Sequence, residues 1–142
     1  MRPRALLLAA GVLAVLSACG SPPAPSPTQS TTVSNRPSSP VKIFLVSPTN
    51  GEVVHGTSVH IVVRIQGGTI SQTYSPHVSP TVGHVHLYFN NQLVYMSYTL
   101  QQDLPVHPGL EYTMYAEFVA QDHLPYNPRD VTPTVFFTVA PS

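Results

Sequence analysis

The sequence predicts an all-β protein, an antiparallel sandwich of about seven short strands. Several segments of residues 41–142 alternate apolar and polar side chains at a period of two, and Gly, Pro and Asn separate these segments. No segment after residue 40 has a helical period. Only 8% of the residues are charged, and the chain has 16 Pro and 7 Tyr, which suits strands and turns better than helices.

The strand candidates follow one another along the second part of the chain. Ser58–Gln66 alternates most clearly, with His60 and Arg64 on its polar face. The polar stretch 67–82 is long for a loop, and loops of this length are often functional. The predicted strands are Lys42–Val46, Ser58–Gln66, Gly83–Phe89, Leu93–Tyr98, Thr99–Leu104, Leu110–Gln121 and Thr134–Val139.

The segment 83–89, with the sequence GHVHLYF, carries the most informative pattern. At a period of two, Val85 and Leu87 point to the buried face of a strand, and His84 and His86 point to the opposite, polar face. The Asn pair that follows tolerates the positive φ of a tight turn. Two imidazoles therefore stand side by side on one strand.

Two short motifs lie beside predicted strands, SPTNGEVV at 47–54 and PGLEY at 108–112. SPTNGEVV resembles the opening of many bacterial immunoglobulin-like domains, and PGLEY is similar to the corner before strand F in such folds. Over residues 41–140 the chain resembles bacterial immunoglobulin-like or fibronectin type III-like domains. The chain lacks the Cys-Trp-Cys trio of antibody domains. The resemblance implies that Gly83–Phe89 is strand C and Leu110–Gln121 is strand F, which are antiparallel neighbours in one sheet.

This topology places the start of strand C beside the end of strand F. His123 continues the outward parity of strand F just beyond its end, so it is expected to meet His84 and His86. Three imidazoles suit Cu²⁺ or Zn²⁺, with Asp122 or Glu117 as a fourth ligand or as a partner that orients an imidazole. If a metal binds, we expect the three nitrogens within about 5 Å of one another.

A plainer interpretation keeps His84 and His86 as solvated sheet-face residues and gives His123 only a role in shaping its loop. The phrases GHVHLYFNN and AQDHLPYNP resemble small secreted bacterial β-sandwich domains of unassigned function, which favours treating the three histidines as one unit. Tyr74 and His77 could fold over the His84 end. The other histidines, expected at the surface, are His55, His60, His77 and His107.

The first twenty residues have the composition of a secretion leader. Basic Arg2 and Arg4 precede the apolar run Ala5–Leu16, which is too short for a permanent membrane span. The following residues, LSACG at 16–20, resemble the lipobox of bacterial lipoproteins. The resemblance implies cleavage before Cys19 and acylation of its thiol; the alternative is an ordinary signal peptide whose cleavage site contains a cysteine.

These observations predict three parts: a signal peptide at 1–18, a lipidated Cys19 with a disordered Pro/Ser/Thr linker at 19–40, and a β-sandwich domain at 41–142. The anchor would hold the domain outside the cytoplasm on a bacterial cell membrane or outer membrane. As Cys19 is the only cysteine, no intrachain disulfide can form.

Charge and motifs narrow the function. The formal net charge is +0 and the domain is mildly acidic, so it lacks a basic surface for nucleic acid. The sequence contains no nucleophile elbow and no phosphate-binding loop, so we expect that the protein is not an enzyme. The leading hypothesis is a monomeric, lipid-anchored immunoglobulin-like module of the cell envelope that binds a protein or small ligand or has a structural role. The alternative is a copper- or zinc-binding protein using His84, His86 and His123.

Overall fold

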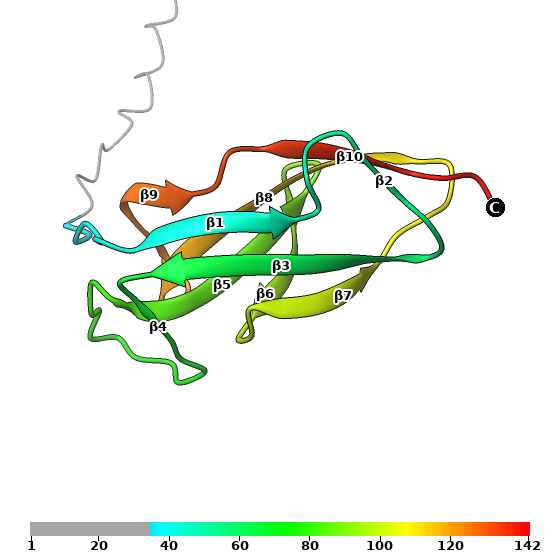
Figure 1. Ribbon diagram of the computed structural model, residues 1–142. Helices are drawn as coiled ribbons and strands as arrows, with labels where there is room; N and C mark the ends of the chain where they lie inside the picture. Colours follow the sequence, from blue (N-terminus) through cyan, green and yellow to red (C-terminus); the bar gives the residue numbers. More distant parts are fainter. Residues whose placement is uncertain (1–34) are drawn as a thin grey trace, which may run out of the picture. The chain divides into compact units, whose positions relative to one another are not determined.

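The computed structural model describes residues 35–142, and of these none lies in a helix. Two β-sheets pack face to face (Figure 1). The described part of the chain contains no helix that could cross a membrane. The strands are β1 Lys42–Ser47, β2 Glu52–Val54, β3 Ser58–Gln66, β4 Thr69–Ile70, β5 Val82–Phe89, β6 Gln92–Ser97, β7 Gln101–Pro105, β8 Glu111–Ala120, β9 Pro125–Val131 and β10 Val135–Val139.

The smaller sheet has the order β1-β3-β7, and the larger has the order β2-β10-β8-β5-β4, with β6 beside β5 and β9 beside β8. Strands β5 and β8 are antiparallel neighbours from Gly83 opposite Ala120 to Phe89 opposite Met114. The predicted pairing of strands C and F, and the predicted all-β sandwich, are therefore confirmed. The start of β5 lies beside the end of β8, as the parity argument requires.

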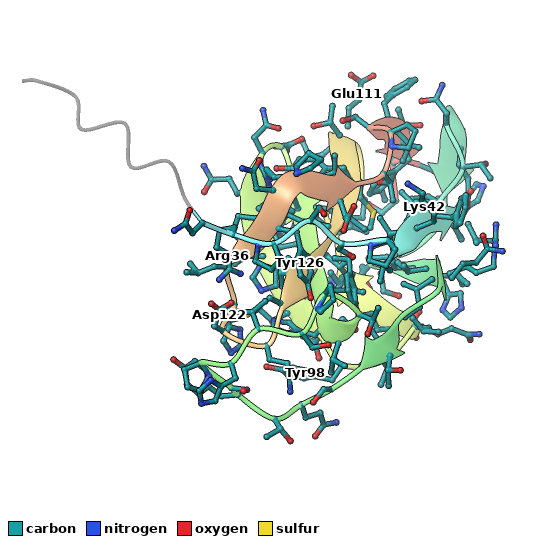
Figure 2. All side chains as sticks on the ribbon, turned by 90° about the vertical axis from the view of Figure 1, so that its left-hand side faces the viewer. Arg36, Lys42, Tyr98, Glu111, Asp122 and Tyr126 are labelled. Carbon is teal, nitrogen blue, oxygen red and sulfur yellow. The ribbon has the colours of Figure 1, made fainter. Side chains whose placement is uncertain are left out.

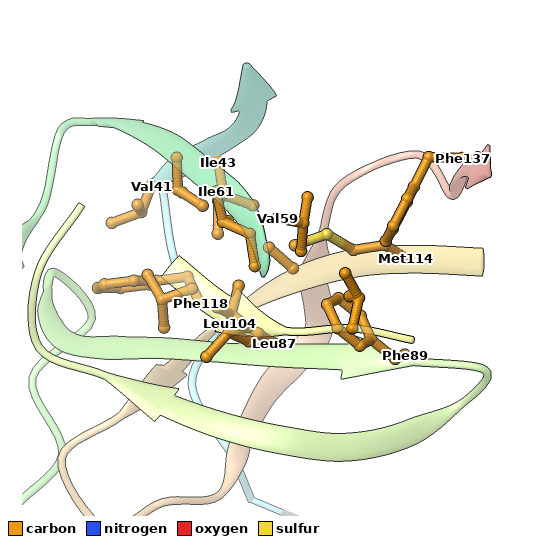
Figure 3. Close-up of a cluster of buried hydrophobic side chains, with 14 of the residues drawn as sticks. Val41, Ile43, Val59, Ile61, Leu87, Phe89, Leu104, Met114, Phe118 and Phe137 are labelled. Carbon is orange, nitrogen blue, oxygen red and sulfur yellow. The ribbon is translucent and has the colours of Figure 1, made fainter. Parts of the chain in front are cut away.

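The core lies between the two sheets (Figure 3). The alternation in β5 is confirmed, because Val85 and Leu87 are fully buried against residues of the facing sheet. Burial of each such side chain stabilises the fold by roughly 1.5–3 kcal/mol. The labelled core residues in Figure 3 are Val41, Ile43, Val59, Ile61, Leu87, Phe89, Leu104, Met114, Phe118 and Phe137.

The sequence predicts about seven strands, whereas the described residues form ten. The additional strands are the short β2 and β4, which pair in parallel with β10 and β5, and β9. The sequence of β9, PYNPRDV, contains two prolines and is not among the predicted strands. The prolines are compatible with a strand because β9 lies at an edge and pairs only with β8. A residue at an edge does not need a backbone N–H to bond to a second neighbouring strand.

The last residues of the predicted linker lie against the domain. Arg36 forms hydrogen bonds with the segment that follows β8, and the Pro37 carbonyl accepts one from the Asn127 backbone N–H at 3.1 Å. Residues 36 and 37, at the end of the predicted linker, therefore contact the domain. The predicted signal peptide, Cys19 and the rest of the linker lie outside the described residues.

Strand β6 is an exposed, apolar edge. The predicted hairpin with β5 is confirmed, and Asn90 and Asn91 have φ values of 50° and 63° in its turn. Four consecutive β6 side chains are 43–46% exposed. These residues are Leu93, Val94, Tyr95 and Met96.

Candidate metal site

All three predicted histidines come together on the outer face of the larger sheet. One nitrogen from each of His84, His86 and His123 lies within 4.8 Å of the others. The Nε2 atoms of His84 and His86 are 3.1 Å apart and share a hydrogen bond, so one of the two nitrogens carries a proton in the metal-free chain. Nitrogen ligands on Zn²⁺ at 2.0–2.1 Å are separated by about 3.5 Å, so the spacing meets the expected limit and needs only a small ring movement to close around an ion.

The β5–β8 pair positions the first two imidazoles. His84 lies opposite Val119 and His86 lies opposite Glu117, so all four side chains share the outer face of the sheet. Gly83 permits the close approach of the strands at this point. A Cβ there would overlap the carbonyl oxygen of Val119 and would lie 3.1 Å from Cζ of Phe118.

The third imidazole comes from the turn after β8. His123 has a φ of 65°, a left-handed conformation that a non-glycine residue seldom adopts, and its N–H donates to the Ala120 carbonyl at 2.9 Å. Its ring packs against His84 with a centroid distance of 4.5 Å. The buried His123 Nδ1 has no hydrogen-bond partner among the described residues, so it is free to coordinate an ion.

Burial keeps the first two imidazoles neutral. His84 is 1% exposed and His86 is 5% exposed, so the interpretation of both as solvated residues is wrong. Burial, and then the neighbouring His86 and His123, lower the pKa of His84 to about 4. Burial also lowers the pKa of His86, although Glu117 opposes this effect. At neutral pH both rings are therefore uncharged, and each has one ring nitrogen with a lone pair that can bind a metal.

The lowered pKa of His84 predicts a loss of stability in acid. Between its unfolded value of 6.5 and its folded value of about 4, the unfolded chain binds a proton that the folded chain does not. The free energy of unfolding therefore has its full value above about pH 6.5. It decreases by about 3 kcal/mol as the pH is lowered from 6.5 to 4. Urea unfolding of the metal-free chain at several pH values measures this fall.

Two variants make the acid prediction specific to the cluster. His84→Asn removes the titrating group, so its stability should fall less steeply than that of the wild type between about pH 6.5 and 4. His55→Asn changes an exposed histidine and should keep the wild-type slope. Equal slopes for wild type and His84→Asn would contradict the prediction.

The acidic residues near the site are already paired. The Asp122 carboxylate accepts two hydrogen bonds from Arg36, at 2.5 and 2.9 Å. The Glu117 carboxylate accepts two from Arg129, both at 2.6 Å. The arginine hydrogen bond is the main reason why the pKa of Asp122 is lowered. Neither carboxylate belongs to the group of candidate ligands, so an ion held by the three imidazoles would take any further ligand from water or an external group.

Two tyrosines border the cluster. The Tyr98 ring lies 5.0 Å from the His84 ring, and the Tyr74 ring stacks on His123 at 6.3 Å with an interplanar angle of 18°. The predicted approach of the loop 67–82 therefore occurs through Tyr74. His77 is exposed, and the other histidines predicted at the surface, His55, His60 and His107, are exposed as well.

Sequence reasoning missed both arginines. Arg36 was placed in the linker, and Arg129 lies in the unpredicted β9. The parity of β8 predicted an outward Glu117, but the side chain is only 1% exposed. Glu117 and Tyr88 lie on the same face of the sheet, and the Tyr88 hydroxyl donates a hydrogen bond to Glu117 at 3.0 Å. This shared face was the feature of the sequence that could have indicated a buried polar network.

The described residues form a two-sheet β-sandwich that carries three clustered imidazoles on the outer face of the larger sheet. Neither a protein-family model nor a curated protein matches the sequence. Among solved structures, the chain is similar to the fibronectin(III)-like modules of Clostridium thermocellum CbhA, with 20% identity and a TM-score of 0.50 over 69% of this chain and 94% of that chain. An identity this low shows the fold alone.

An engineered protein also matches, at 15% identity and a TM-score of 0.41 over 70% of this chain and 20% of that chain. This second likeness is too low to carry an argument. The fold assignment therefore rests on the sheet topology and on the first similarity, and the chemistry rests on the residues of the site.

Proposed function

We propose that this chain is a lipid-anchored, extracytoplasmic metal-binding protein that holds one copper or zinc ion through His84, His86 and His123. The main support for this proposal is that one imidazole nitrogen from each of the three histidines lies within 4.8 Å of the others. The role is binding, without catalysis. The lipobox-like sequence LSACG at 16–20 supports an anchor at Cys19, which would keep the domain on the outer side of a bacterial membrane.

The donor set supports copper or zinc over other ions. Imidazole nitrogen suits Zn²⁺ and copper, whereas Mg²⁺ and Ca²⁺ prefer oxygen ligands. The carboxylates that could have supplied such oxygens are bound by Arg36 and Arg129. A purely structural or protein-binding module would not explain why two histidines are buried beside an unpartnered third.

Metal titration of the purified full chain in detergent, with any affinity tag removed, tests the proposal. The wild type should bind about one Cu²⁺ or Zn²⁺ per chain and no Mg²⁺ at the same concentration. His84→Ala removes one of three ligands and should weaken binding by more than about 100-fold. Equilibrium dialysis followed by metal analysis gives both the stoichiometry and the affinity.

His55→Ala is the matched control, because it removes an exposed imidazole outside the cluster. It should bind metal as the wild type does. Failure of the wild type to bind either ion would contradict the proposal. Equal binding by wild type and His84→Ala would also contradict it, since the metal would then be held elsewhere.

A further inference from the structure

Arg36, in the segment before β1, forms several hydrogen bonds with the loop that carries His123. The Arg36 Nη1 and Nη2 groups donate to the two oxygens of Asp122, at 2.5 and 2.9 Å. Nη2 also donates to the Leu124 carbonyl, and Nε donates to the Pro125 carbonyl, both at 2.9 Å. The residues on both sides of His123 are thus bound to a single guanidinium. Figure 2 shows Arg36 and Asp122 on the same side of the domain.

The contact between Arg36 and Asp122 is largely buried, and its geometry is specific. The Arg36 and Asp122 side chains are only 17% and 12% exposed. A planar guanidinium matches a carboxylate through two parallel hydrogen bonds, which fixes orientation as well as distance. The Pro37 carbonyl adds a main-chain bond to Asn127, so the segment 36–37 is joined to β9 as well as to the loop.

The loop needs such support because its backbone is unfavourable at the ligand itself. His123 has a φ of 65°, in the left-handed region that non-glycine residues seldom adopt and that is less favourable for them than the right-handed conformation. Without an external hold, the turn would relax toward a lower-energy conformation. The His123 ring would then leave its place 4.5 Å from the His84 ring.

We propose that Arg36 is a positioning residue of the metal site, and that metal occupancy and docking of the segment 35–40 are coupled. This inference rests on the proposed function. Arg36 holds the turn in which His123 faces the other two imidazoles, so losing this contact weakens metal binding. By linkage, a bound metal holds the turn in that same conformation and so strengthens docking of the segment. The chain next to the predicted linker therefore responds to whether the site is filled.

The test uses the full chain in detergent and titrates it with Cu²⁺. Arg36→Met should weaken copper binding about 10- to 100-fold, the usual effect of removing a partner that orients a ligand. Arg36→Lys keeps a positive charge near Asp122 but cannot donate the two parallel hydrogen bonds of a guanidinium. Its affinity for copper should therefore lie between those of Arg36→Met and the wild type. Arg64→Met is the matched control, because Arg64 lies over the Phe44 ring, outside the cluster, and should bind as the wild type does.

Two further readouts separate positioning from a general effect on folding. In the electron paramagnetic resonance spectrum, Arg36→Met should show fewer coordinating nitrogens than the wild type at equal copper loading. Hydrogen exchange at the Asn127 amide, which donates to Pro37, should slow when wild-type chain binds Zn²⁺. The Arg64→Met control should reproduce both wild-type results.

The outcomes distinguish this inference from the proposed function. If the wild type binds no metal, the proposed function fails. If the wild type binds metal and Arg36→Met binds it with the same affinity and the same nitrogen count, only the inference fails. If Arg36→Met does not fold, Arg36→Lys decides the question, and wild-type affinity in that variant together with unchanged Asn127 exchange on Zn²⁺ binding overturns the inference.

Discussion

Replacing Arg129 with methionine is expected to lower the free energy of unfolding by about 3–5 kcal/mol, because it leaves a buried carboxylate without its counterion. Glu117 is 1% exposed and accepts two hydrogen bonds from Arg129, both at 2.6 Å. The Tyr88 hydroxyl is then its one remaining side-chain partner among the described residues. Burial, and then the Glu117 carboxylate, raise the pKa of Tyr88 to about 12, so this donor stays protonated.

Removing the other partner should cost less, because the two ends of the pair are exposed unequally. The Arg129 side chain is 51% exposed, so solvent can hydrate it in Glu117→Gln. That variant also keeps a polar group that can bond to Tyr88. We expect it to lose roughly 1–2 kcal/mol. In the double variant no charge is buried, so it should be more stable than Arg129→Met alone.

Urea unfolding of the wild type, both single variants and the double variant measures this coupling as a double-mutant cycle. Arg64→Met again serves as the control, since it removes only an exposed contact with Phe44 and should cost less than about 1 kcal/mol. The account is wrong if Arg129→Met is as stable as the wild type, or if the two single changes are simply additive.

Gly83→Ala is the second change with a large expected effect, a loss of about 3–5 kcal/mol. The new Cβ would overlap the carbonyl oxygen of Val119 and lie 3.0 Å from its carbonyl carbon. These are backbone atoms of β8, and they cannot rotate away as a side chain can. Relief requires β5 and β8 to separate where His84 begins the site, so metal binding should weaken along with stability.

Gly51→Ala is the control for this substitution. Gly51 has a φ of 81° and no atom within 4 Å of the added Cβ, so only the left-handed conformation opposes the change. A loss of about 1–2 kcal/mol is expected there. Thermal or urea unfolding compares the two variants. Similar small losses for both would show that the strands can separate easily at Gly83.

Much of the site was predictable because it depends on strand parity. The alternation in 83–89 assigns His84 and His86 to one face, and an antiparallel neighbour must bring the end of the next strand to the same edge. His123 was therefore placed correctly from its position just beyond β8. Parity indicates only which face a side chain occupies. It does not show that the rings of His84, His86, His123 and Tyr98 cover one another.

The parts that were missed depend on contacts between distant segments of irregular composition. Arg36 lies in a stretch rich in Pro and Ser, where a lone arginine gives no signal of its partner Asp122, 86 residues away. Arg129 lies in β9, whose prolines conceal a strand that only edge pairing permits. Because neither arginine was predicted near the site, Glu117 and Asp122 were both expected to be available as metal ligands.

Strand β6 has a consequence for the behaviour of the molecule among its own copies. Natural sheets protect their outermost strands with charge, proline or distortion, whereas Gln92–Ser97 has neither a charged residue nor a proline. Its register with β5 shifts between Leu87 and Tyr88, which is an irregularity that bends the ladder. An irregularity of this kind hinders edge-to-edge pairing with a strand of a second chain, so a change that made the β5–β6 ladder regular would favour self-association.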